Sequence, residues 1–531
     1  MSTDTSFSIA RSFKSFFIGT FFSRISGLLR DILMAFFFGT SPHIAAFMVA
    51  YRFANLFRRL LGEASFQAGF VPHYENLRLE DKKKASIFYR DLFFSITFLL
   101  AIIILLTEMF LFSSSSLFKN NETINLTKIM LVGLVFICLY ALNSSFLQCH
   151  QSYFLPSVAP AIFNVVWIGC AIFFRNVETE KFIFILAFFI VVAFFFQYLT
   201  TAFSSFRIVR QDLNLKELIK FKLFTKDIKK LVKPILLSII GISAVQINSA
   251  LDAVFATLAE KEGPAYLWYA IRLYQLPLAL FAIAISSAIL PPLSRAFKLD
   301  DFLNFKRFFS FGMAKSFAFM LPSSIALIIL GPSIINLIFA RGAFDTFALI
   351  NTSNCLFGYA IGLCFATFVM IISTAFYAKK EYFIPTIAAI ISVIANIFLN
   401  LIFIYYFHLK STSIAIATSF SAILNFAILS FFLKKRIKEI FSKNLIYSCV
   451  NTFFCTAFAA FVTIFIGYLL QDPTINFLLS KNFVFPKFFL DKALSFLKIS
   501  SIYVIALFVS AYFLKNKEIL EIVAKYRKPT L

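Results

Sequence analysis

The stretch Ser23-Arg-Ile-Ser-Gly-Leu-Leu-Arg-Asp31 places three charges inside an apolar run that is otherwise long enough to cross a bilayer. Each charge at the centre of a membrane helix costs about 2.5–3.5 kcal/mol on insertion scales, so arginines facing lipid would nearly cancel the apolar gain. We therefore expect Arg24 and Arg30 to line a polar cavity, where they are available to an anion. The alternative is that one arginine near a helix end reaches the headgroups by snorkelling.

The composition of the whole chain indicates a polytopic membrane protein. Of its 531 residues, 60% are hydrophobic, and the mean hydropathy of +0.85 excludes the soluble globular class. Apolar segments of about 20 residues or more predict an all-α fold of fourteen transmembrane helices. The predicted spans are 9–38, 43–72, 86–112, 124–149, 155–174, 181–203, 233–258, 264–293, 308–338, 344–378, 383–407, 412–433, 444–470 and 493–515.

Lysine and arginine concentrate in alternate loops between these spans. The basic segments are 73–90, 204–233, 295–307, 434–443 and the tail from Lys515. The positive-inside rule places them on the cytoplasmic face, so we expect a multi-pass membrane protein with both termini inside. Topology and anionic headgroups explain the net charge of +24, and nucleic acid is not an expected partner.

An internal repeat predicts two pseudo-symmetric six-helix lobes. Arg52 and Arg272 lie in the similar segments AYRFANL and AIRLYQL, and each is followed twenty residues later by a proline, Pro72 or Pro292. A repeat that starts on the same side of the membrane is a parallel repeat, which many alternating-access transporters have. Chance similarity between two apolar segments is the alternative. The predicted parts are an N-terminal lobe with its basic linker at 1–232, a second lobe at 233–440, and spans 13 and 14 with a basic tail at 441–531.

Span 2 carries charged residues along one helical face. Arg52, Asn55, Arg59 and Glu63 recur at i, i+3, i+7 and i+11, which aligns them on that face. Glu63 follows Arg59 by one turn and can pair with it. Arg58 lies about 120° away on an ideal wheel and joins this face only if the helix bends or ends nearby.

Arginines on spans 1, 2 and 8 predict one central cationic cavity. Asp31 and Glu63 are candidates for gating or ion pairing, but they are too few to neutralise the arginines. Guanidinium groups match phosphate oxygens bidentately, so the expected ligand carries phosphate. The candidate substrate-binding residues are Arg24, Arg30, Arg52, Arg58, Arg59 and Arg272.

Several of these motifs resemble the MurJ/MviN family. The segments that carry the resemblance are Ser23–Asp31, Asn55-Leu-Phe-Arg-Arg59, Gly62-Glu-Ala-Ser-Phe66, Phe70-Val-Pro72, Tyr269-Ala-Ile-Arg-Leu273, Ile289-Leu-Pro-Pro-Leu-Ser294, and Phe376-Tyr377 before Pro385. They run through spans 1 to 12 in the family's order, whereas spans 13 and 14 match by hydropathy only. The resemblance implies a lipid II flippase of the MOP exporter superfamily in the bacterial inner membrane, which moves the undecaprenyl-diphosphate-linked peptidoglycan precursor to the outer leaflet.

The resemblance also implies roles for particular residues. The family's functional cavity arginines match Arg24, Arg30, Arg58 and Arg272, and its spans 13 and 14 form a groove for the lipid tail. The candidates to line that groove are Phe453, Phe454, Phe458 and Phe461. Ala45 and Ile271 stand where family members often carry Asp; both replacements make the cavity more positive and bear on any gate or coupling step that uses those carboxylates.

A sodium ion is the one candidate cofactor, as a coupling ion, because some family members bind sodium in the C-terminal half. The residues that look like the equivalent oxygen ligands are Asp252, Asn396, Asn400 and Thr418. Asparagines in a transmembrane helix often bond to neighbouring helices instead, which is the alternative. The expected partners are lipid II, the surrounding membrane lipids and, as a candidate, the cell-wall synthesis machinery.

Two other classes of protein share part of this pattern. A flippase for another polyprenyl-diphosphate-linked oligosaccharide, or a drug exporter, would share the architecture, but a cavity for cationic drugs would favour acidic residues. An intramembrane glycosyltransferase on such a lipid would need a catalytic carboxylate in a sizeable external loop or a metal-binding acidic motif. The sequence carries no such motif, so we expect no enzymatic activity.

Overall fold

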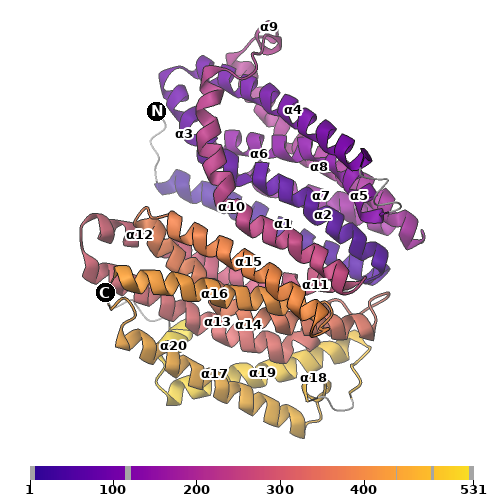
Figure 1. Cartoon of the computed structure of the whole chain (residues 1–531), viewed down its shortest axis with the longest axis vertical. Coiled ribbons are helices and arrows are strands. Elements are labelled where there is room, and N and C mark those ends of the chain that lie inside the picture. The colour runs from indigo at the N-terminus through magenta and orange to yellow at the C-terminus, as the bar shows by residue number, and fades with distance from the viewer. Residues whose placement is uncertain (1–5, 62, 114–120, 438, 480–482, 525–531) are drawn as a thin grey trace. The chain divides into compact units, whose positions relative to one another are not determined.

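The computed structural model describes residues 6–61, 63–113, 121–437, 439–479 and 483–524, and every regular element in these ranges is a helix (Figure 1). The helices that coincide with predicted spans 1 to 7 are α1 (Ser6–Phe38), α2 (Pro42–Leu61) with α3 (Glu63–Glu80), α4 (Lys82–Ser113), α5 (Glu122–Leu131) with α6 (Leu134–Cys149), α7 (Phe154–Phe173), α8 (Thr179–Asp212) and α10 (Lys226–Ala259). Those that coincide with spans 8 to 14 are α11 (Gly263–Pro277) with η2 (Leu278–Ala282) and α12 (Ile283–Lys298), α13 (Phe302–Ile338), α14 (Thr346–Ala378), α15 (Phe383–Tyr405), α16 (Thr412–Arg436), α17 (Lys443–Leu469) and α19 (Phe489–Phe513). Three short helices lie between or after them: α9 (Leu215–Ile219), α18 (Pro473–Leu478) and α20 (Lys517–Ala524).

Ten of the described helices are long and apolar enough to cross a membrane. The count rises to eleven if α5 and α6, which meet at a 44° bend, form one span. Their apolar side chains face outward as well as inward: on α4, Leu105, Leu106 and Met109 are each about 60% exposed. A soluble protein would not expose such a continuous apolar surface, whereas lipid covers it at no cost. This part of the chain is therefore a multi-pass membrane protein.

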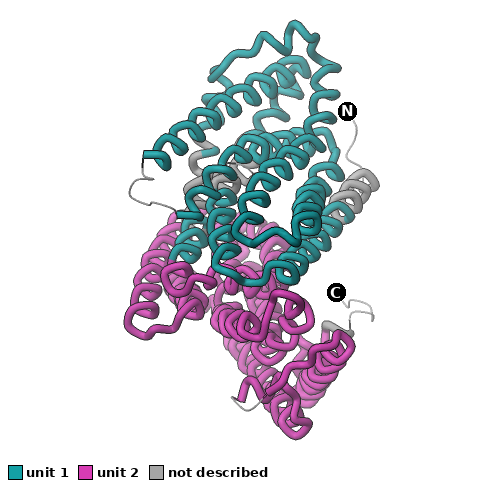
Figure 2. The backbone as a smooth tube through the Cα atoms, turned by 90° about the vertical axis from the view of Figure 1, so that its right-hand side faces the viewer, with its two compact units in different colours: residues 1–254 teal, residues 255–531 magenta. Residues whose placement is uncertain are grey.

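The chain divides into two compact units, residues 1–254 and 255–531 (Figure 2). In unit 1, α7 packs against α1 and α8, and α8 packs against α6. The contact between α1 and α7 is close, because a Cβ added to Gly19 would lie 2.0 Å from the Ser157 hydroxyl. Only glycine allows the two backbones to approach this closely.

The basic connection that precedes α10 is packed against α4. The backbone N–H of Lys222 donates to Asp91 Oδ1 at 3.0 Å, and that of Phe224 donates to Ser95 Oγ at 3.2 Å. The Arg90 guanidinium donates to the Glu217 carbonyl and to Asp91. The predicted linker is therefore held in place by buried polar residues of α4.

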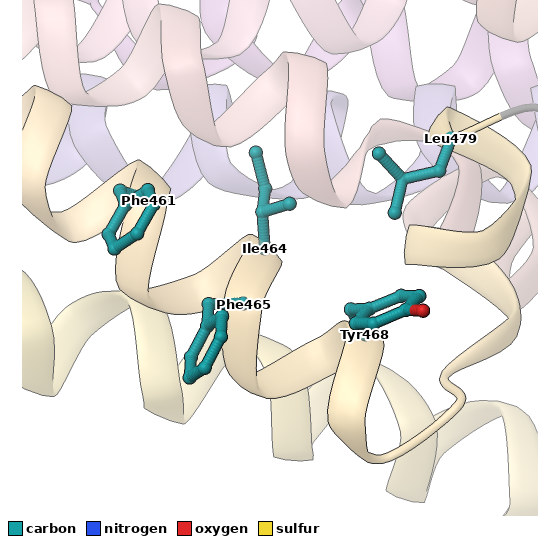
Figure 3. A pocket seen from close by; sticks show the side chains of 5 residues that line it. All are labelled: Phe461, Ile464, Phe465, Tyr468 and Leu479. Atoms are coloured by element: carbon teal, nitrogen blue, oxygen red, sulfur yellow. The ribbon is translucent and has the colours of Figure 1, made fainter.

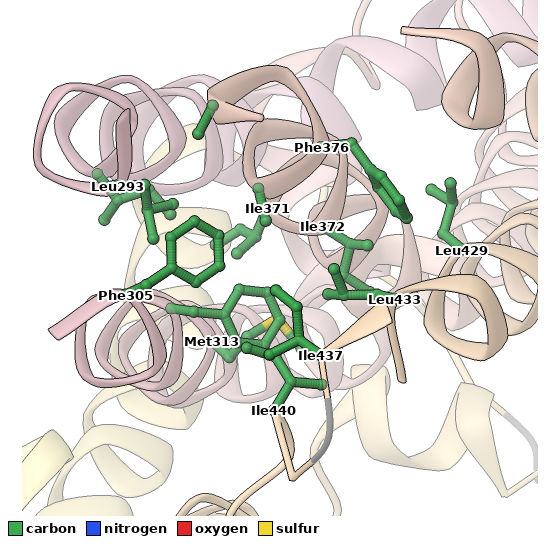
Figure 4. Packing of buried hydrophobic residues seen from close by; sticks show 14 of the residues in the cluster. Leu293, Phe305, Met313, Ile371, Ile372, Phe376, Leu429, Leu433, Ile437 and Ile440 are labelled. Carbon is green, nitrogen blue, oxygen red and sulfur yellow. The ribbon is translucent and has the colours of Figure 1, made fainter. Parts of the chain in front are cut away.

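Unit 2 is built around α14, which packs against α11, α13 and α16. Its core is a buried apolar cluster that includes Phe305, Ile371, Phe376 and Leu433 (Figure 4). The C-terminal helices α17 and α19 pack on α13, where the Tyr503 hydroxyl donates to the Pro322 carbonyl at 2.8 Å. The tyrosine thereby ties α19 to the middle of α13.

Candidate functional site

Arg30 is the centre of a buried polar cluster between α1 and α7. Its Nε and Nη2 donate to Asp31 Oδ1 at 3.0 and 2.8 Å, and its Nη1 donates to Asn164 Oδ1 at 3.0 Å. The guanidinium also lies 4.5 Å from the centroid of the Trp167 ring. Arg30 and Asp31 are only 6% and 4% exposed, so charge pairing, an amide and an aromatic face replace the water that the cation has lost.

Asn164 also ties this cluster to the first turns of the Ser23–Asp31 stretch. Its Nδ2 donates to the Ser23 carbonyl at 3.2 Å and to the Ser26 hydroxyl at 3.0 Å. Gly27 lies against the same amide, since a Cβ added there would be 3.5 Å from Nδ2. The amide therefore positions both the arginine and the helix that carries it. Asp31, which was predicted to take part in gating or ion pairing, forms an ion pair with the adjacent Arg30.

The remaining predicted residues of unit 1 have different surroundings. Arg24 is exposed, and Arg52 is partly buried with its Nη1 3.5 Å from the Ser249 carbonyl of α10. Asp252 is 6% exposed and accepts from Asn248 Nδ2 at 3.3 Å, one turn earlier on α10. The side chains of Arg58, Arg59 and Glu63 lie outside the described residues, so the predictions made for them stay predictions.

Arg272 is the predicted arginine of unit 2. It is partly buried on α11, with its Cζ 4.2 Å from the centroid of the Trp268 ring one turn earlier. The helix changes form soon after it: α11 ends at Pro277 and continues as the π-helix η2, Leu278–Ala282. Proline at this point removes a backbone donor, and such wide turns recur at functional sites. Pro277 therefore lies at the junction between the α-helical and the π-helical part of this segment.

The three predicted sodium ligands of unit 2 lie on neighbouring helices α15 and α16. Asn396 and Asn400 are fully buried, and Asn400 Nδ2 donates to Asn396 Oδ1 at 2.9 Å. The Thr418 hydroxyl donates to the Ile414 carbonyl of its own helix at 2.9 Å. Asp252, the fourth residue of the set, belongs to unit 1. No group of three or more His, Cys, Asp or Glu among the described residues is arranged to hold a metal ion.

An aromatic stripe runs along the exposed face of α17. The residues spaced i, i+4, i+7, i+11 and i+14 along it are Phe454, Phe458, Phe461, Phe465 and Tyr468, which are 44–68% exposed. At its C-terminal end the stripe forms one wall of an apolar groove with a volume of about 380 Å³. Phe461, Ile464, Phe465 and Tyr468 line the groove together with Leu479, which follows α18 (Figure 3). Of the four phenylalanines predicted to contact a lipid tail, Phe461 lines this groove, and Phe453, Phe454 and Phe458 are exposed on α17.

A second polar cluster lies where α3 meets the end of α6. The Tyr74 hydroxyl lies 2.9 Å from His150 Nε2, and Arg78 Nη1 donates to the Cys149 carbonyl at 2.6 Å. Burial, and then the nearby Arg78 charge, lower the pKa of His150 to about 4. The imidazole is therefore neutral at physiological pH.

Sequence reasoning missed the two tryptophans, which are the only two in the chain. Each lies against an intramembrane arginine, Trp167 against Arg30 and Trp268 against Arg272. The spacing of Trp268 and Arg272, four residues on one helix, was a readable signal. Trp167 and Asn164 lie on another helix from Arg30, and no local pattern connects them.

The comparisons with known proteins agree on one family. A family model described as "Lipid II flippase MurJ" matches residues 34–485. A probable lipid II flippase MurJ of Chlamydia muridarum is 30% identical over 485 residues, which cover 90% of this chain and 89% of that protein. The corresponding protein of Aquifex aeolicus is 29% identical over 426 residues, covering 78% of this chain and 81% of its own.

Solved structures show the same relationship. A lipid II flippase MurJ in an inward closed conformation matches with a TM-score of 0.74 and 26% identity, over 94% of this chain and 99% of its own. An inward-facing multidrug resistance MATE family transporter of the MOP superfamily matches with a TM-score of 0.67 over 79% of this chain and 96% of its own. Its 16% identity makes that second likeness one of fold alone.

Proposed function

This chain belongs to the lipid II flippase MurJ family, and we propose on that premise that it moves lipid II, the undecaprenyl-diphosphate-linked peptidoglycan precursor, from the inner to the outer leaflet by alternating access. Family membership identifies a transporter rather than an enzyme. The observation that carries the proposal is the match of the family model over residues 34–485, which include Arg52, Arg272 and the aromatic stripe of α17.

The proposed ligands of the diphosphate head are arginines of α1 and α2, which belong to unit 1, and of α11, which belongs to unit 2. Exposed Arg24 and partly buried Arg52 and Arg272 offer guanidinium groups that match phosphate oxygens. Arg30 differs from them, because Asp31 already neutralises much of its charge. We infer that Arg30 can accept the head only by loosening its bond to Asp31, which would couple binding to a movement of α1 against α7.

The proposed binding site for the polyprenyl chain is the exposed aromatic stripe of α17. Keeping each CH₂ group of the chain out of hydrocarbon would cost about 0.8 kcal/mol, so the tail needs a surface continuous with lipid. Phe458, Phe461 and Phe465 offer such a surface, and the apolar groove at its end is open to the outside of the protein. The head and the tail of the substrate would then occupy chemically different parts of the molecule.

The proposed topology has fourteen spans. Eleven are the apolar spans described above, and the other three are α1, the pair of α2 and α3, and α10. These helices carry Arg24, Arg30, Asp31, Arg52 and Asp252, as expected of cavity-lining spans. The distribution of Lys and Arg supports cytoplasmic termini, and the similarity of the segments around Arg52 and Arg272 supports two lobes related by a parallel repeat. The sodium site at Asp252, Asn396, Asn400 and Thr418, and contact with the cell-wall synthesis machinery, are proposed on the same family basis.

The test is complementation of a bacterium whose own MurJ is depleted, together with flipping of labelled lipid II in proteoliposomes. The intact chain should restore growth, and Arg272→Gln should abolish flipping, while Arg272→Lys keeps part of it because only the bidentate fork is lost. Arg207→Gln is the matched control, since Arg207 is exposed near the end of α8. A chain that inserts normally but neither complements nor flips lipid II would contradict the proposal.

A further inference from the structure

Two basic side chains meet where α13 ends and α19 begins. Arg341 Nη2 donates to the Leu337 carbonyl at 2.7 Å, and the guanidinium lies 4.7 Å from the centroid of the Phe489 ring. Lys492, one turn into α19, is only 4% exposed and donates from Nζ to the Ala340 carbonyl. Both cations therefore contact the last turn of α13 and the residues just after it.

Attraction to a helix C-terminus explains only part of this arrangement. The partial charge there is about half an elementary charge, which does not balance two full positive charges. Each cation uses one donor on a carbonyl, whereas arginine has five N–H donors and lysine has three. Arg341 Nε is buried and has no hydrogen-bond partner among the described residues. A buried donor in this state costs free energy unless a ligand satisfies it.

Three carboxylates stand on the neighbouring elements, Asp345 before α14, Asp472 before α18 and Asp491 in the first turn of α19. Asp472 accepts from the Thr474 backbone at 2.9 Å and from the Ser495 hydroxyl at 3.1 Å. Asp345 caps α14 by accepting from the Ala348 backbone at 2.8 Å. Neither Arg341 nor Lys492 forms a salt bridge with any carboxylate in the described ranges. No carboxylate is thus bonded to the pair, and its remaining N–H donors can serve a phosphate group.

We propose that Arg341 and Lys492 bind a phosphate group of the exported diphosphate lipid after the head has crossed the membrane. An arginine fork and a lysine point charge together suit phosphate oxygens. The inference rests on the proposed function and on its topology, in which the C-terminal end of α13 faces the outside. It assigns a second, outward phosphate site in addition to the arginines of α1, α2 and α11.

The apolar groove lies at the same end of unit 2. Leu479 of the groove follows α18, and α18 is tied to α13 by a 2.8 Å hydrogen bond between the hydroxyls of Thr474 and Ser333. The segment after it reaches α13 again, where Asn336 Nδ2 donates to the Pro486 carbonyl at 3.3 Å. One lipid would then place its chain in the groove and its phosphate at the cation pair. A polyprenyl diphosphate should therefore bind better than a free anion, which has no chain to place in the groove.

Photo-crosslinking of the full-length chain tests the proposal. The chain carrying Tyr468→benzoylphenylalanine is reconstituted in phosphatidylcholine vesicles with undecaprenyl diphosphate or, in parallel, with uncharged undecaprenol. Arg341→Gln and Lys492→Gln should each lower the crosslinking of undecaprenyl diphosphate about tenfold, the loss expected for one charge-assisted hydrogen bond. Lys492→Arg should retain most of the yield. Crosslinking of undecaprenol should not change, because it has no phosphate.

A matched control variant separates loss of the cation pair from a general loss of positive charge. Lys181 is an exposed lysine at the start of α8 and is paired with Glu178, so Lys181→Gln should leave the crosslinking of undecaprenyl diphosphate unchanged. If Lys492→Gln fails to fold, Arg341→Gln and Lys492→Arg carry the test.

Three outcomes would overturn the proposal. Undiminished crosslinking of undecaprenyl diphosphate in Arg341→Gln would show that the cation pair does not bind the lipid, and an equal loss for undecaprenol would show a structural role only. Competition by phosphatidylglycerol as strong as by undecaprenyl diphosphate itself would assign the site to a phospholipid. Arg341-dependent crosslinking in a protein that does not flip lipid II would support the site and contradict the proposed function.

Discussion

Replacing Asp31 with alanine should destabilise the protein, because it leaves the Arg30 guanidinium buried without its carboxylate. The two side chains are 6% and 4% exposed, and two N–H groups of Arg30 donate to Asp31 Oδ1. Removing one partner of a buried ion pair costs about 3–5 kcal/mol. Arg30 keeps its 3.0 Å bond to Asn164 and its position 4.5 Å from Trp167, so we expect a loss near the lower end, about 3 kcal/mol.

Removing both charges together should recover much of this loss. An apolar pair of similar volume often replaces a buried ion pair without a net cost, so Arg30→Met with Asp31→Leu removes the unpaired charge. The Asn164 carbonyl then loses a donor, which costs about 1–3 kcal/mol. The double variant should therefore be more stable than Asp31→Ala alone.

Reversible unfolding by SDS in bicelles measures the stabilities, and flipping of labelled lipid II in proteoliposomes measures transport. The double variant should be folded but inactive, because no guanidinium remains at position 30. An Asp31→Ala protein within about 0.5 kcal/mol of the wild type would refute the energetic reasoning, since it would match an ordinary surface substitution. A double variant that still flips lipid II would instead refute a role for Arg30 in binding the diphosphate.

Three further predictions concern other parts of the chain. Deleting residues 441–531 should leave a folded core that no longer flips long-chain substrate, and full complementation by the truncated protein would contradict the role of α17 and α19. Sodium should raise the thermal stability of the wild type, and Asp252→Ala should abolish that rise; a rise that survives the substitution would remove this residue from the site. The pKa of His150 falls from 6.5 to about 4 on folding, so the unfolded chain binds more protons between these values and stability should drop as pH falls through this window. His150→Gln should flatten that dependence of the unfolding temperature between pH 7 and pH 5, and an unchanged slope would assign it to other groups.

The sequence by itself determined the elements of this protein and its family. The predicted apolar segments coincide with helices in the described ranges, and ten or eleven of these helices are long and apolar enough to cross a membrane, because such spans follow from local hydropathy over about 20 residues. The break at Pro277 was equally local, since proline disturbs the helix in which it stands. The motifs of spans 1, 2 and 8 resemble the family that the comparisons then identified.

Only the tertiary structure decided what surrounds each charge. Arg30 and Asn164 are 134 residues apart in the chain, and their contact depends on the close packing of α1 against α7. Counting acids and bases along the sequence predicted an excess of positive charge, but it did not show that Arg30 is the arginine held by Asp31, an amide and a tryptophan. The pair of Arg341 and Lys492 likewise joins the ends of two helices that are distant in sequence. Hydropathy is a property of a segment, whereas the neighbours of a buried charge are set by which helices pack together.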